Sequence, residues 1–175
     1  MGIRTVRTEG DECLRKVCKP VKSVSLRTRI LIEDMFDTMY ESGGVGLAAP
    51  QIGVLKRIVV MDTDDNQHVL INPQILEVSG EQTGYEGCLS IPGKSGIVTR
   101  PDYVKVKALN ERGEEYVLEG EGLLARCICH ECDHLDGILY SDKAEGGLIN
   151  NEDLPEDEEE EKSEEAETEE EAETG

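Results

Sequence analysis

Aromatic side chains are scarce in this chain. Among its 175 residues there is no tryptophan and one phenylalanine, and aromatic residues make up 3% of the sequence. A hydrophobic core therefore has to be built mainly from aliphatic side chains, which a single domain of this length can do. No segment approaches the roughly 18 uninterrupted apolar residues of a membrane-spanning helix, so we expect no membrane association.

The N-terminus lacks the features of an export signal. Residues 1–7 carry positive charge, but no apolar segment follows them. We therefore expect no signal peptide, and a cytoplasmic location follows as the default.

Basic residues are outnumbered, and most of the acidic excess lies at one end. The net charge is −21, but residues 151–175 alone contain 15 acidic residues and one lysine. The preceding 150 residues have a net charge of only −7. This part of the chain shows no basic patch of the kind that nucleic-acid-binding proteins carry, so we expect no specific nucleic-acid partner.

The composition divides the chain into a globular domain over residues 1–148 and an acidic tail over residues 149–175. From Glu152 onward the sequence is nearly all glutamate with alanine, serine and threonine. Such a segment has too few apolar groups to offset the entropy lost on ordering, so we predict that the tail is disordered.

Hydrophobic periodicity predicts helices over residues 23–42 and 123–135. The first has Ser25 as a candidate N-cap and ends at a Gly-Gly pair, and Gly137 can end the second. Short apolar segments predict strands at residues 57–62, 67–71, 75–78, 97–98, 104–109 and 115–118. This order predicts an α+β fold, in which small, mostly antiparallel sheets pack around the late helix.

Six cysteines stand out in a chain that has only three histidines. They are Cys13, Cys18, Cys88, Cys127, Cys129 and Cys132. Three of them lie within six residues of each other, beside two of the histidines. In a cytoplasmic chain this clustering indicates metal chemistry before disulfides, although buried free thiols remain the expectation for most of the six.

The segment from His130 to His134 reads His-Glu-Cys-Asp-His and fits the pattern H-E-x-x-H. On a helix, positions i and i+4 share a face, so both imidazoles can bind one ion. Glu131 is turned far enough round the helix to face a water molecule on that ion. A divalent ion lowers the pKa of such a water, and a nearby carboxylate can take its proton. The pattern therefore indicates metal-assisted hydrolysis of an amide.

Catalytic sites of this type need a third protein ligand and one open position. The extended pattern with a third histidine fails, because residue 140 is tyrosine. A glutamate ligand from a later helix is not favoured, because everything later is short or belongs to the acidic tail. The third ligand should therefore lie upstream. In the segment Glu86-Gly87-Cys88-Leu89-Ser90, a thiolate from Cys88 could complete the site. A second upstream segment, residues 43–53, is rich in glycine and carries the amide of Gln51.

Three segments together resemble the peptide deformylase family, whose members carry G-φ-G-L-A-A-x-Q, E-G-C-L-S and H-E-x-D-H in this order. Here they stand as Gly44-Val45-Gly46-Leu47-Ala48-Ala49-Pro50-Gln51, Glu86-Gly87-Cys88-Leu89-Ser90 and His130-Glu131-Cys132-Asp133-His134. The resemblance runs from about residue 3 to residue 141. The short link between the first two segments is similar to that of the compact bacterial type, and residues 1–148 would form the catalytic domain.

The resemblance implies hydrolysis of the N-formyl group from nascent peptides that begin with formyl-methionine, with release of formate. It implies Cys88, His130 and His134 as metal ligands and Glu131 as general acid/base. Gln51 and the backbone N–H of Leu89 would stabilise the oxyanion. Gly46 would position the substrate backbone, and the segment that includes Gly44 and Val45 would pair with the peptide as an added strand.

The same resemblance implies one divalent metal ion per chain. The family's natural ion is Fe²⁺, which Zn²⁺ or Ni²⁺ often replaces, and one thiolate with two imidazoles suits iron or zinc. It also implies transient association with the ribosome, which better-studied bacterial members contact through a basic, helical C-terminus. Here the C-terminus is polyanionic and would be repelled by ribosomal RNA, which argues against docking through the tail. A further departure is Cys129, where many members have glutamine.

The remaining candidate residues have simpler interpretations. Cys127 lies one turn before the first metal histidine and could line the site, although a buried thiol is favoured. Cys129 and Cys132 fall off the metal-binding face of the helix, so a redox or zinc role for this pair is not favoured. We expect Asp133 to make a structural hydrogen bond and His68 to lie at the surface.

A metal-binding protein without activity is the competing class. It would hold structural zinc through ligands chosen from Cys127, Cys129, His130, Cys132 and His134, because closed zinc sites favour four protein ligands and no water. This alternative leaves Glu131, Gln51 and Cys88 without a role. The variant Cys88→Ala separates the two classes, since its metal content would be unchanged only in a structural zinc module. A homologue that has lost activity ranks lower, because all three motifs are intact.

Overall fold

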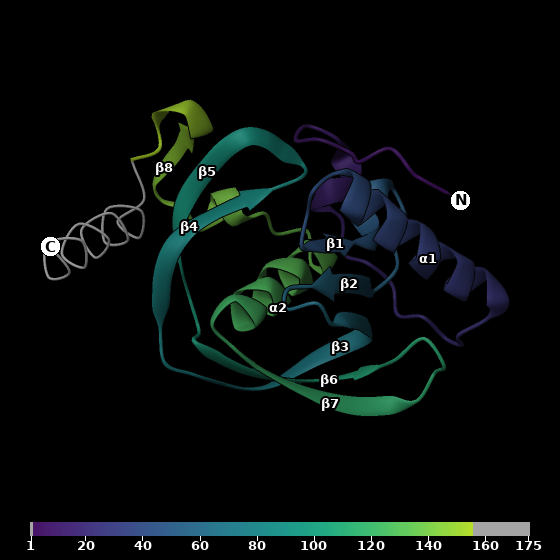
Figure 1. Ribbon diagram of the computed structural model, residues 1–175. Coiled ribbons are helices and arrows are strands. Elements are labelled where there is room, and N and C mark those ends of the chain that lie inside the picture. The colour runs from purple at the N-terminus through teal and green to yellow at the C-terminus, as the bar shows by residue number, and fades with distance from the viewer. Residues whose placement is uncertain (1, 156–175) are drawn as a thin grey trace, which may run out of the picture.

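Two antiparallel sheets surround one helix in the computed structural model, which describes residues 2–155 (Figure 1). The α-helices are α1 (Leu26–Glu41) and α2 (Gly122–Leu135). The strands are β1 (Gly46–Ala48), β2 (Ile58–Asp62), β3 (Gln67–Ser79), β4 (Gln82–Cys88), β5 (Ile91–Arg100), β6 (Tyr103–Leu109), β7 (Glu115–Glu121) and β8 (Glu145–Asn150). The predicted α+β class is confirmed.

The larger sheet has the strand order β1-β2-β3-β6-β7, and the smaller has the order β4-β5-β8. Every strand pair in both sheets is antiparallel. Consecutive strands pair as hairpins in β2–β3, β4–β5 and β6–β7. Strands β1 and β4 each lie at the edge of their sheet, so each has one side without a strand partner.

Strand β2 is apolar along most of its length because both of its faces are buried. Its side chains alternate between two faces, as in any strand. Ile58 and Val60 pack in the core cluster that contains α1, whereas Val59 and Met61 pack in the cluster that contains α2. The larger sheet is thus covered by a helix on each face at this point. Both faces are dry, and aliphatic side chains suffice to fill them.

Helix α1 begins where the sequence provides a cap. The hydroxyl of Ser25 accepts a hydrogen bond from the backbone N–H of Thr28 at 3.3 Å, in a capping box. The helix buries Leu31, Met35 and Met39 against the sheet. At its C-terminus the chain turns at Gly43, with φ of +73°, into β1. The glycine-rich segment that follows the helix therefore lies at the edge of the sheet.

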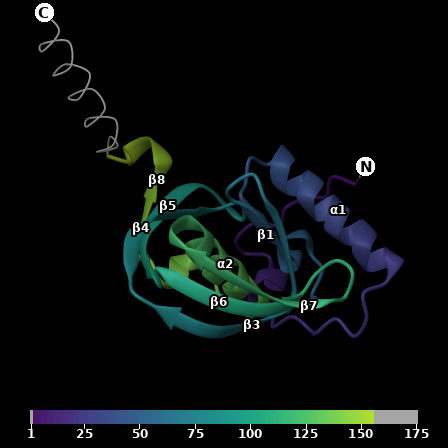
Figure 2. The same cartoon turned by 60° about the horizontal axis from the view of Figure 1, so that its bottom comes forward.

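Helix α2 is the central element of the molecule. Ten of its 14 residues are buried. It lies between the larger sheet and the curved β4–β5 hairpin, as Figure 2 shows. Its packing is hydrophobic on the side of the larger sheet and polar on the side of the hairpin, where buried charged residues meet.

Several elements differ from the sequence prediction. The segments predicted at residues 67–71 and 75–78 form one strand, β3, which continues through an irregularity at Asn72, where φ is +52°. The strand predicted at 97–98 is part of the longer β5, and β1, β4 and β8 were not predicted. Strand β8 crosses the boundary expected at residue 148, and a 3-10 helix, Asn151–Asp153, follows it. The part of the predicted tail beyond residue 155 lies outside the described residues.

Within residues 2–155, none of the helices combines the length and the apolar character that crossing a membrane requires.

The N-terminal segment passes close to the C-terminal end of α2 at Gly137, and the effect of a side chain at that position on stability can be predicted. Gly137 has φ of +75°, and a Cβ there would lie 2.5 Å from the backbone oxygen of Arg15. Gly113 has φ of +79°, but a Cβ there meets nothing closer than the Val24 side chain at 3.6 Å. Gly113→Ala should therefore cost only the left-handed strain of about 1–2 kcal/mol, and Gly137→Ala should cost about 2 kcal/mol more because backbone has to move. Urea unfolding measures both; equal losses would contradict this packing.

Candidate metal centre and substrate cleft

Side chains from β4 and α2 meet at one point. Cys88 is the last residue of β4, and His130 and His134 lie one turn apart on α2. One ligand atom from each of the three residues lies within 4.8 Å of the others. The Sγ of Cys88 is 3.4 Å from the Nε2 of His134, and the two imidazole rings meet edge to face with centroids 5.1 Å apart. The structure thus brings together the three residues that the sequence analysis proposed as ligands.

This group fits a divalent metal ion by its chemistry. One thiolate and two imidazoles are a donor set for iron or zinc, and three ligands leave a position open. Burial lowers the pKa of His134 well below its ordinary value, so its ring is neutral, which is the form that binds metals. Burial alone would lower the pKa of His130 too, but Cys88 and Glu86 raise it to about 10. Cys88 and Glu86 therefore stabilise positive charge at His130, beside the neutral ring of His134.

A buried carboxylate, Glu86, orients one of the candidate ligands. It is 6% exposed and accepts hydrogen bonds from Arg100 Nε at 2.8 Å, Arg126 Nη1 at 2.6 Å and His130 Nδ1 at 2.7 Å. Burial by itself would raise the pKa of Glu86, but the hydrogen bonds from His130 and Arg100 lower it to about 2. Because Nδ1 of His130 is engaged, its Nε2 is left for a metal, the arrangement usual for metal-bound histidines.

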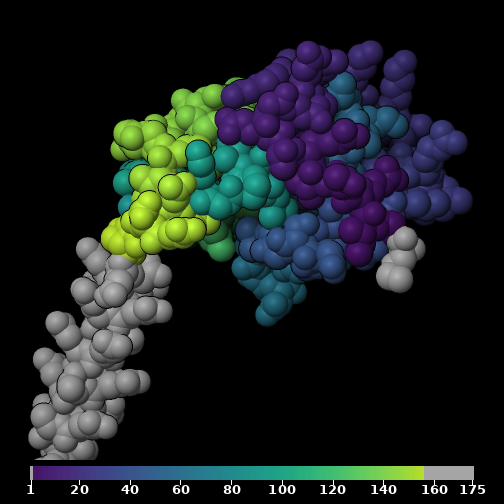
Figure 3. Space-filling view, turned by 90° about the horizontal axis from the view of Figure 1, so that it is seen from above, coloured from purple at the N-terminus to yellow at the C-terminus, as the bar shows by residue number. Residues whose placement is uncertain are grey.

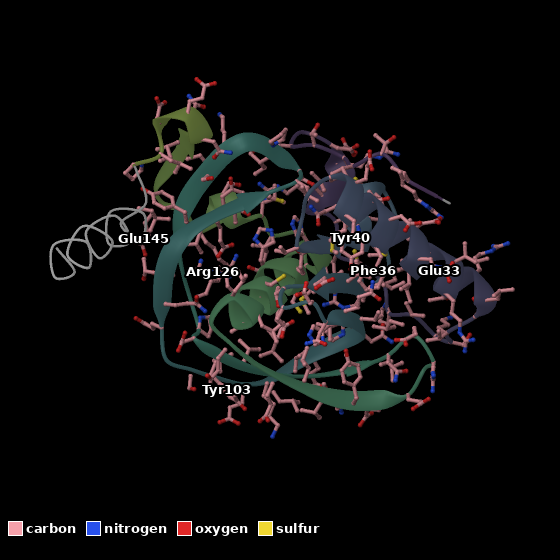
Figure 4. All side chains as sticks on the ribbon, in the orientation of Figure 1. Glu33, Phe36, Tyr40, Tyr103, Arg126 and Glu145 are labelled. Atoms are coloured by element: carbon pink, nitrogen blue, oxygen red, sulfur yellow. The ribbon has the colours of Figure 1, made fainter. Side chains whose placement is uncertain are left out.

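Two arginines hold this carboxylate from different elements. Arg100 ends β5, and its guanidinium also binds Asp133 at 2.7 Å. Arg126 comes from α2 and lies between the helix and β4 in Figure 4. Asp133 receives a second ion pair from Lys143 at 3.0 Å. The structural hydrogen bond expected of Asp133 is thus confirmed.

Glu131 lines the cleft. Its side chain is 4% exposed, and within residues 2–155 its Oε2 has no hydrogen-bond partner. Burial raises its pKa to about 7. A Cβ on Gly46 would lie only 2.7 Å from its Oε1, so glycine at residue 46 is what leaves room for this carboxylate. A buried carboxyl group whose pKa lies near neutral pH is suited to accept and donate a proton.

The amide of Gln51 is fixed beside Cys88. Gln51 lies in a 3-10 helix, Ala49–Ile52, and its Oε1 accepts the backbone N–H of Ala48 at 2.9 Å. Its Nε2 therefore points the other way, 3.1 Å from the hydroxyl of Ser90 and 3.5 Å from the Sγ of Cys88. The orientation of the amide is thus set by the backbone, with its donors on the side of the candidate ligands.

A cleft of about 570 Å³ opens onto these groups. Its lining includes the other residues that the sequence analysis proposed, namely Gly44, Val45, Gly46 and Leu89. A Cβ on Gly44 would lie 2.7 Å from the end of the Leu89 side chain, so the two segments pack closely here and a larger residue would displace that side chain. The N-terminal segment lies beside the β4–β5 turn (Figure 3), where the N–H of Glu9 donates to the carbonyl of Ser90 at 2.8 Å.

The remaining cysteines do not join the candidate ligands. Cys127 is buried and lines the cleft, with its Sγ 3.9 Å from the carbonyl of Val45. Cys129 and Cys132 pack in the core between α2 and the larger sheet. Within residues 2–155, the only group of cysteine, histidine and acidic residues close enough to hold a metal is the one formed by Cys88, His130 and His134. The alternative of a structural zinc site on α2 therefore has no support in the geometry.

Sequence reasoning missed some of the residues that build the site. Arg100 and Arg126 were not recognised, and Glu86 was noted only as part of a motif. An arginine inside the otherwise apolar segment 123–128 was the available signal. His68, which was expected at the surface rather than among the ligands, is not part of the metal group; its side chain is partly exposed and lies 3.8 Å from the exposed Asp64.

The depressed pKa of Glu86 generates a prediction about stability. Because its pKa is lower in the folded chain, its stabilisation is fully present above its ordinary value of 4.5 and is lost as the pH falls towards 2. We expect Glu86→Gln to be less stable than the unchanged chain by about 3 kcal/mol at pH 7, and this difference to narrow as the pH falls from 5 to 3. Urea unfolding with a chelator present measures it. A difference that does not vary with pH would contradict the assignment.

Comparison with known proteins identifies the family. A family profile for polypeptide deformylases matches residues 3–151. Peptide deformylase from Agathobacter rectalis is 59% identical over 158 residues, which cover 89% of this chain and 100% of that protein. Peptide deformylase from Lachnoclostridium phytofermentans is 55% identical over 163 residues, which cover 91% of this chain and 100% of that protein.

Solved structures agree with the sequence relatives. The crystal structure of a peptide deformylase from Legionella pneumophila superposes with a TM-score of 0.80 and 47% identity, covering 83% of this chain and 88% of that one. The peptide deformylase from Synechococcus elongatus in complex with actinonin gives a TM-score of 0.81 and 41% identity, covering 83% of each chain. The chain therefore belongs to the polypeptide deformylase family.

Proposed function

We propose that this chain, as a polypeptide deformylase, removes the formyl group from N-formylmethionyl nascent peptides at the site formed by Cys88, His130 and His134. One observation carries the assignment of these residues. The three candidate ligands would leave one coordination position of a bound metal ion open towards a single cleft. Beside that position lie the buried carboxylate of Glu131, whose Oε2 is unpaired within residues 2–155, and the fixed amide of Gln51. Metal-assisted hydrolysis of an amide uses these three kinds of group together.

The ion that we propose in the cell is Fe²⁺, one per chain, with Zn²⁺ or Ni²⁺ as substitutes. The donor set of one sulfur and two nitrogens accepts each of them, so the residues alone do not select iron over zinc. When bound there, the ion supplies Lewis acidity to a water molecule and to the formyl oxygen.

Glu131 is the proposed general acid/base. Its unpaired Oε2 can take a proton from the attacking water as the oxygen bonds to the formyl carbon. The same carboxyl can then give that proton to the amine nitrogen as the C–N bond breaks, which yields formate and a free N-terminus. The absence of a side chain at Gly46 keeps the space in front of this carboxylate open to the substrate.

Gln51 and the backbone N–H of Leu89 are the proposed donors to the oxygen on which negative charge develops. The amide of Gln51 is held by the backbone of Ala48, so no reorientation is needed during the reaction. Preorganised donors of this kind stabilise a transition state more than a ground state.

The peptide itself is proposed to bind as an added strand. Both β1 and β4 are edge strands, and both contribute to the cleft lining. Gly44 and Val45 lie directly before β1, where an extended peptide can pair with the backbone, and Gly46 would position the reacting end. Recognition through backbone groups suits nascent chains, whose sequences beyond the first residue vary.

Such a substrate places the enzyme in the cytoplasm, in transient contact with ribosomes. The segment 156–175 contains 13 acidic residues and one lysine, so repulsion from ribosomal RNA disfavours docking through it. Any ribosome contact would have to use another surface.

The role of Glu131 is tested by Glu131→Gln, which keeps the shape of the side chain and removes its basicity. We expect formate release from a formyl-Met tripeptide to fall by about 10³-fold, within the range known for general acid–base groups. Metal content should stay at one ion per chain, because Glu131 is not a proposed ligand. Glu145→Gln, which changes an exposed carboxylate of β8, is the control and should retain full activity. Activity of Glu131→Gln close to that of the control would refute the mechanism.

The identity of the ion is tested by purifying the protein with and without oxygen. The anaerobic preparation should contain iron and lose its activity within minutes to hours in air, whereas protein reloaded with Zn²⁺ should be stable in air. Metal analysis and formate release are followed on the same samples. An anaerobic preparation that contains zinc alone, with unchanged activity after exposure to air, would exclude Fe²⁺ as the resident ion.

A further inference from the structure

The aromatic ring of Tyr140 lies against one of the candidate metal ligands. Tyr140 begins a short 3-10 helix, Tyr140–Asp142, that follows α2, and its side chain is 1% exposed. Its ring stacks on the imidazole of His130, with centroids 5.9 Å apart and an angle of 26° between the planes. This separation lies within the range in which aromatic pairs attract each other.

His130 needs a second constraint because its hydrogen bond to Glu86 fixes only one atom. A ring that is held at Nδ1 can still rock about that point and move its Nε2. The stacked ring of Tyr140 limits this motion on one face, and the ring of His134 limits it elsewhere. The position of Nε2 is therefore defined by contacts with three residues from three different segments of the chain.

The hydroxyl of Tyr140 reaches in a different direction. It donates a hydrogen bond to the backbone carbonyl of Lys94 at 3.3 Å. Lys94 and Ser95 lie in β5 and line the substrate cleft. Lys94 pairs with Asn150 of β8, and the hydroxyl of Ser95 donates to the Oδ1 of Asn151 at 2.6 Å. This wall of the cleft, formed by Lys94, Ser95 and Asn151, is thus joined to the ring that packs against His130.

Packing alone does not explain a tyrosine here. The other buried residues of its cluster are Leu14, Ile91, Val98 and Leu139, which are all aliphatic, and Cys88 is among the partly buried residues packed against them. A phenylalanine would fill the same space, and a buried hydroxyl is unfavourable unless it is hydrogen-bonded. The hydrogen bond to the carbonyl of Lys94 compensates the cost of burying the hydroxyl. The ring of Tyr140 thus contacts His130, whereas its hydroxyl contacts Lys94.

From these contacts we propose that Tyr140 is a positioning residue with two separable roles. Its ring holds His130 in the orientation that binds the metal, and its hydroxyl holds the cleft wall at Lys94 against the bound peptide. The inference rests on the proposed function, in which His130 is a ligand and the cleft binds the formyl peptide.

Two variants separate the roles in the zinc-loaded enzyme. Tyr140→Phe keeps the ring and removes the hydroxyl. We expect it to release zinc to a chromophoric chelator at the unchanged rate, within about 2-fold, and to raise KM for a formyl-Met tripeptide by at least about 3-fold with little change in kcat. Tyr140→Leu removes the ring as well. We expect it to release zinc at least about 10-fold faster, as for other residues that orient metal ligands.

Leu139→Ala is the matched control, because it removes a buried side chain of the same cluster that offers no ring to His130. It should lower the melting temperature and leave zinc release unchanged. If Tyr140→Leu does not fold, Tyr140→Met takes its place, since it keeps more of the volume without a ring.

The outcomes distinguish the two roles from each other and from the proposed function. Zinc release from the ringless variant at the rate of Leu139→Ala overturns the role of the ring. An unchanged KM in Tyr140→Phe overturns the role of the hydroxyl. If the unmodified enzyme released no formate, the proposed function would fail and the role of the hydroxyl with it, whereas the zinc-release comparison would still decide the role of the ring.

Discussion

The site depends on the buried carboxylate of Glu86 and the three cationic or proton-donating groups around it. This carboxylate lies on β4, whereas its partners lie on β5 (Arg100) and α2 (Arg126 and His130). The interaction therefore fixes the smaller sheet against the central helix and places Cys88, two residues along β4, opposite the histidines. Removing one partner from such a buried cluster is costly, about 3–5 kcal/mol, because a charge remains unpaired in a dry environment.

The same arrangement explains how an apolar helix can carry polar functional groups. One side of α2 packs against aliphatic residues of the larger sheet and supplies the stability of the fold. On the other side, His130 and Glu131 line the cleft, and His130 and His134 contact Glu86 and Cys88 of β4. The carboxylate of Glu131, whose Oε2 has no hydrogen-bond partner within residues 2–155, lies there beside Gly46, which leaves it space.

Local sequence patterns predicted what depends on neighbours along the chain. The cap at Ser25, the apolar run of β2 and the histidine spacing on α2 are such features. Strand β4 was missed because its glycines and polar residues show no apolar alternation, and its conformation is imposed by pairing with β5. The contacts of Glu86 join residues 14, 40 and 44 positions apart, and no local pattern contains that information. The role of Tyr140 was hidden for the same reason.

The central claim is that one thiolate, from Cys88, and two imidazoles bind a single catalytic ion. X-ray absorption spectroscopy of the anaerobically purified protein tests it most directly, because sulfur and nitrogen ligands are distinguished by distance. The account predicts one sulfur at about 2.3 Å with nitrogen or oxygen ligands at about 2.0–2.2 Å, and loss of the sulfur contribution in Cys88→Ala. Two or more sulfur ligands, or a spectrum unchanged by that substitution, would contradict it.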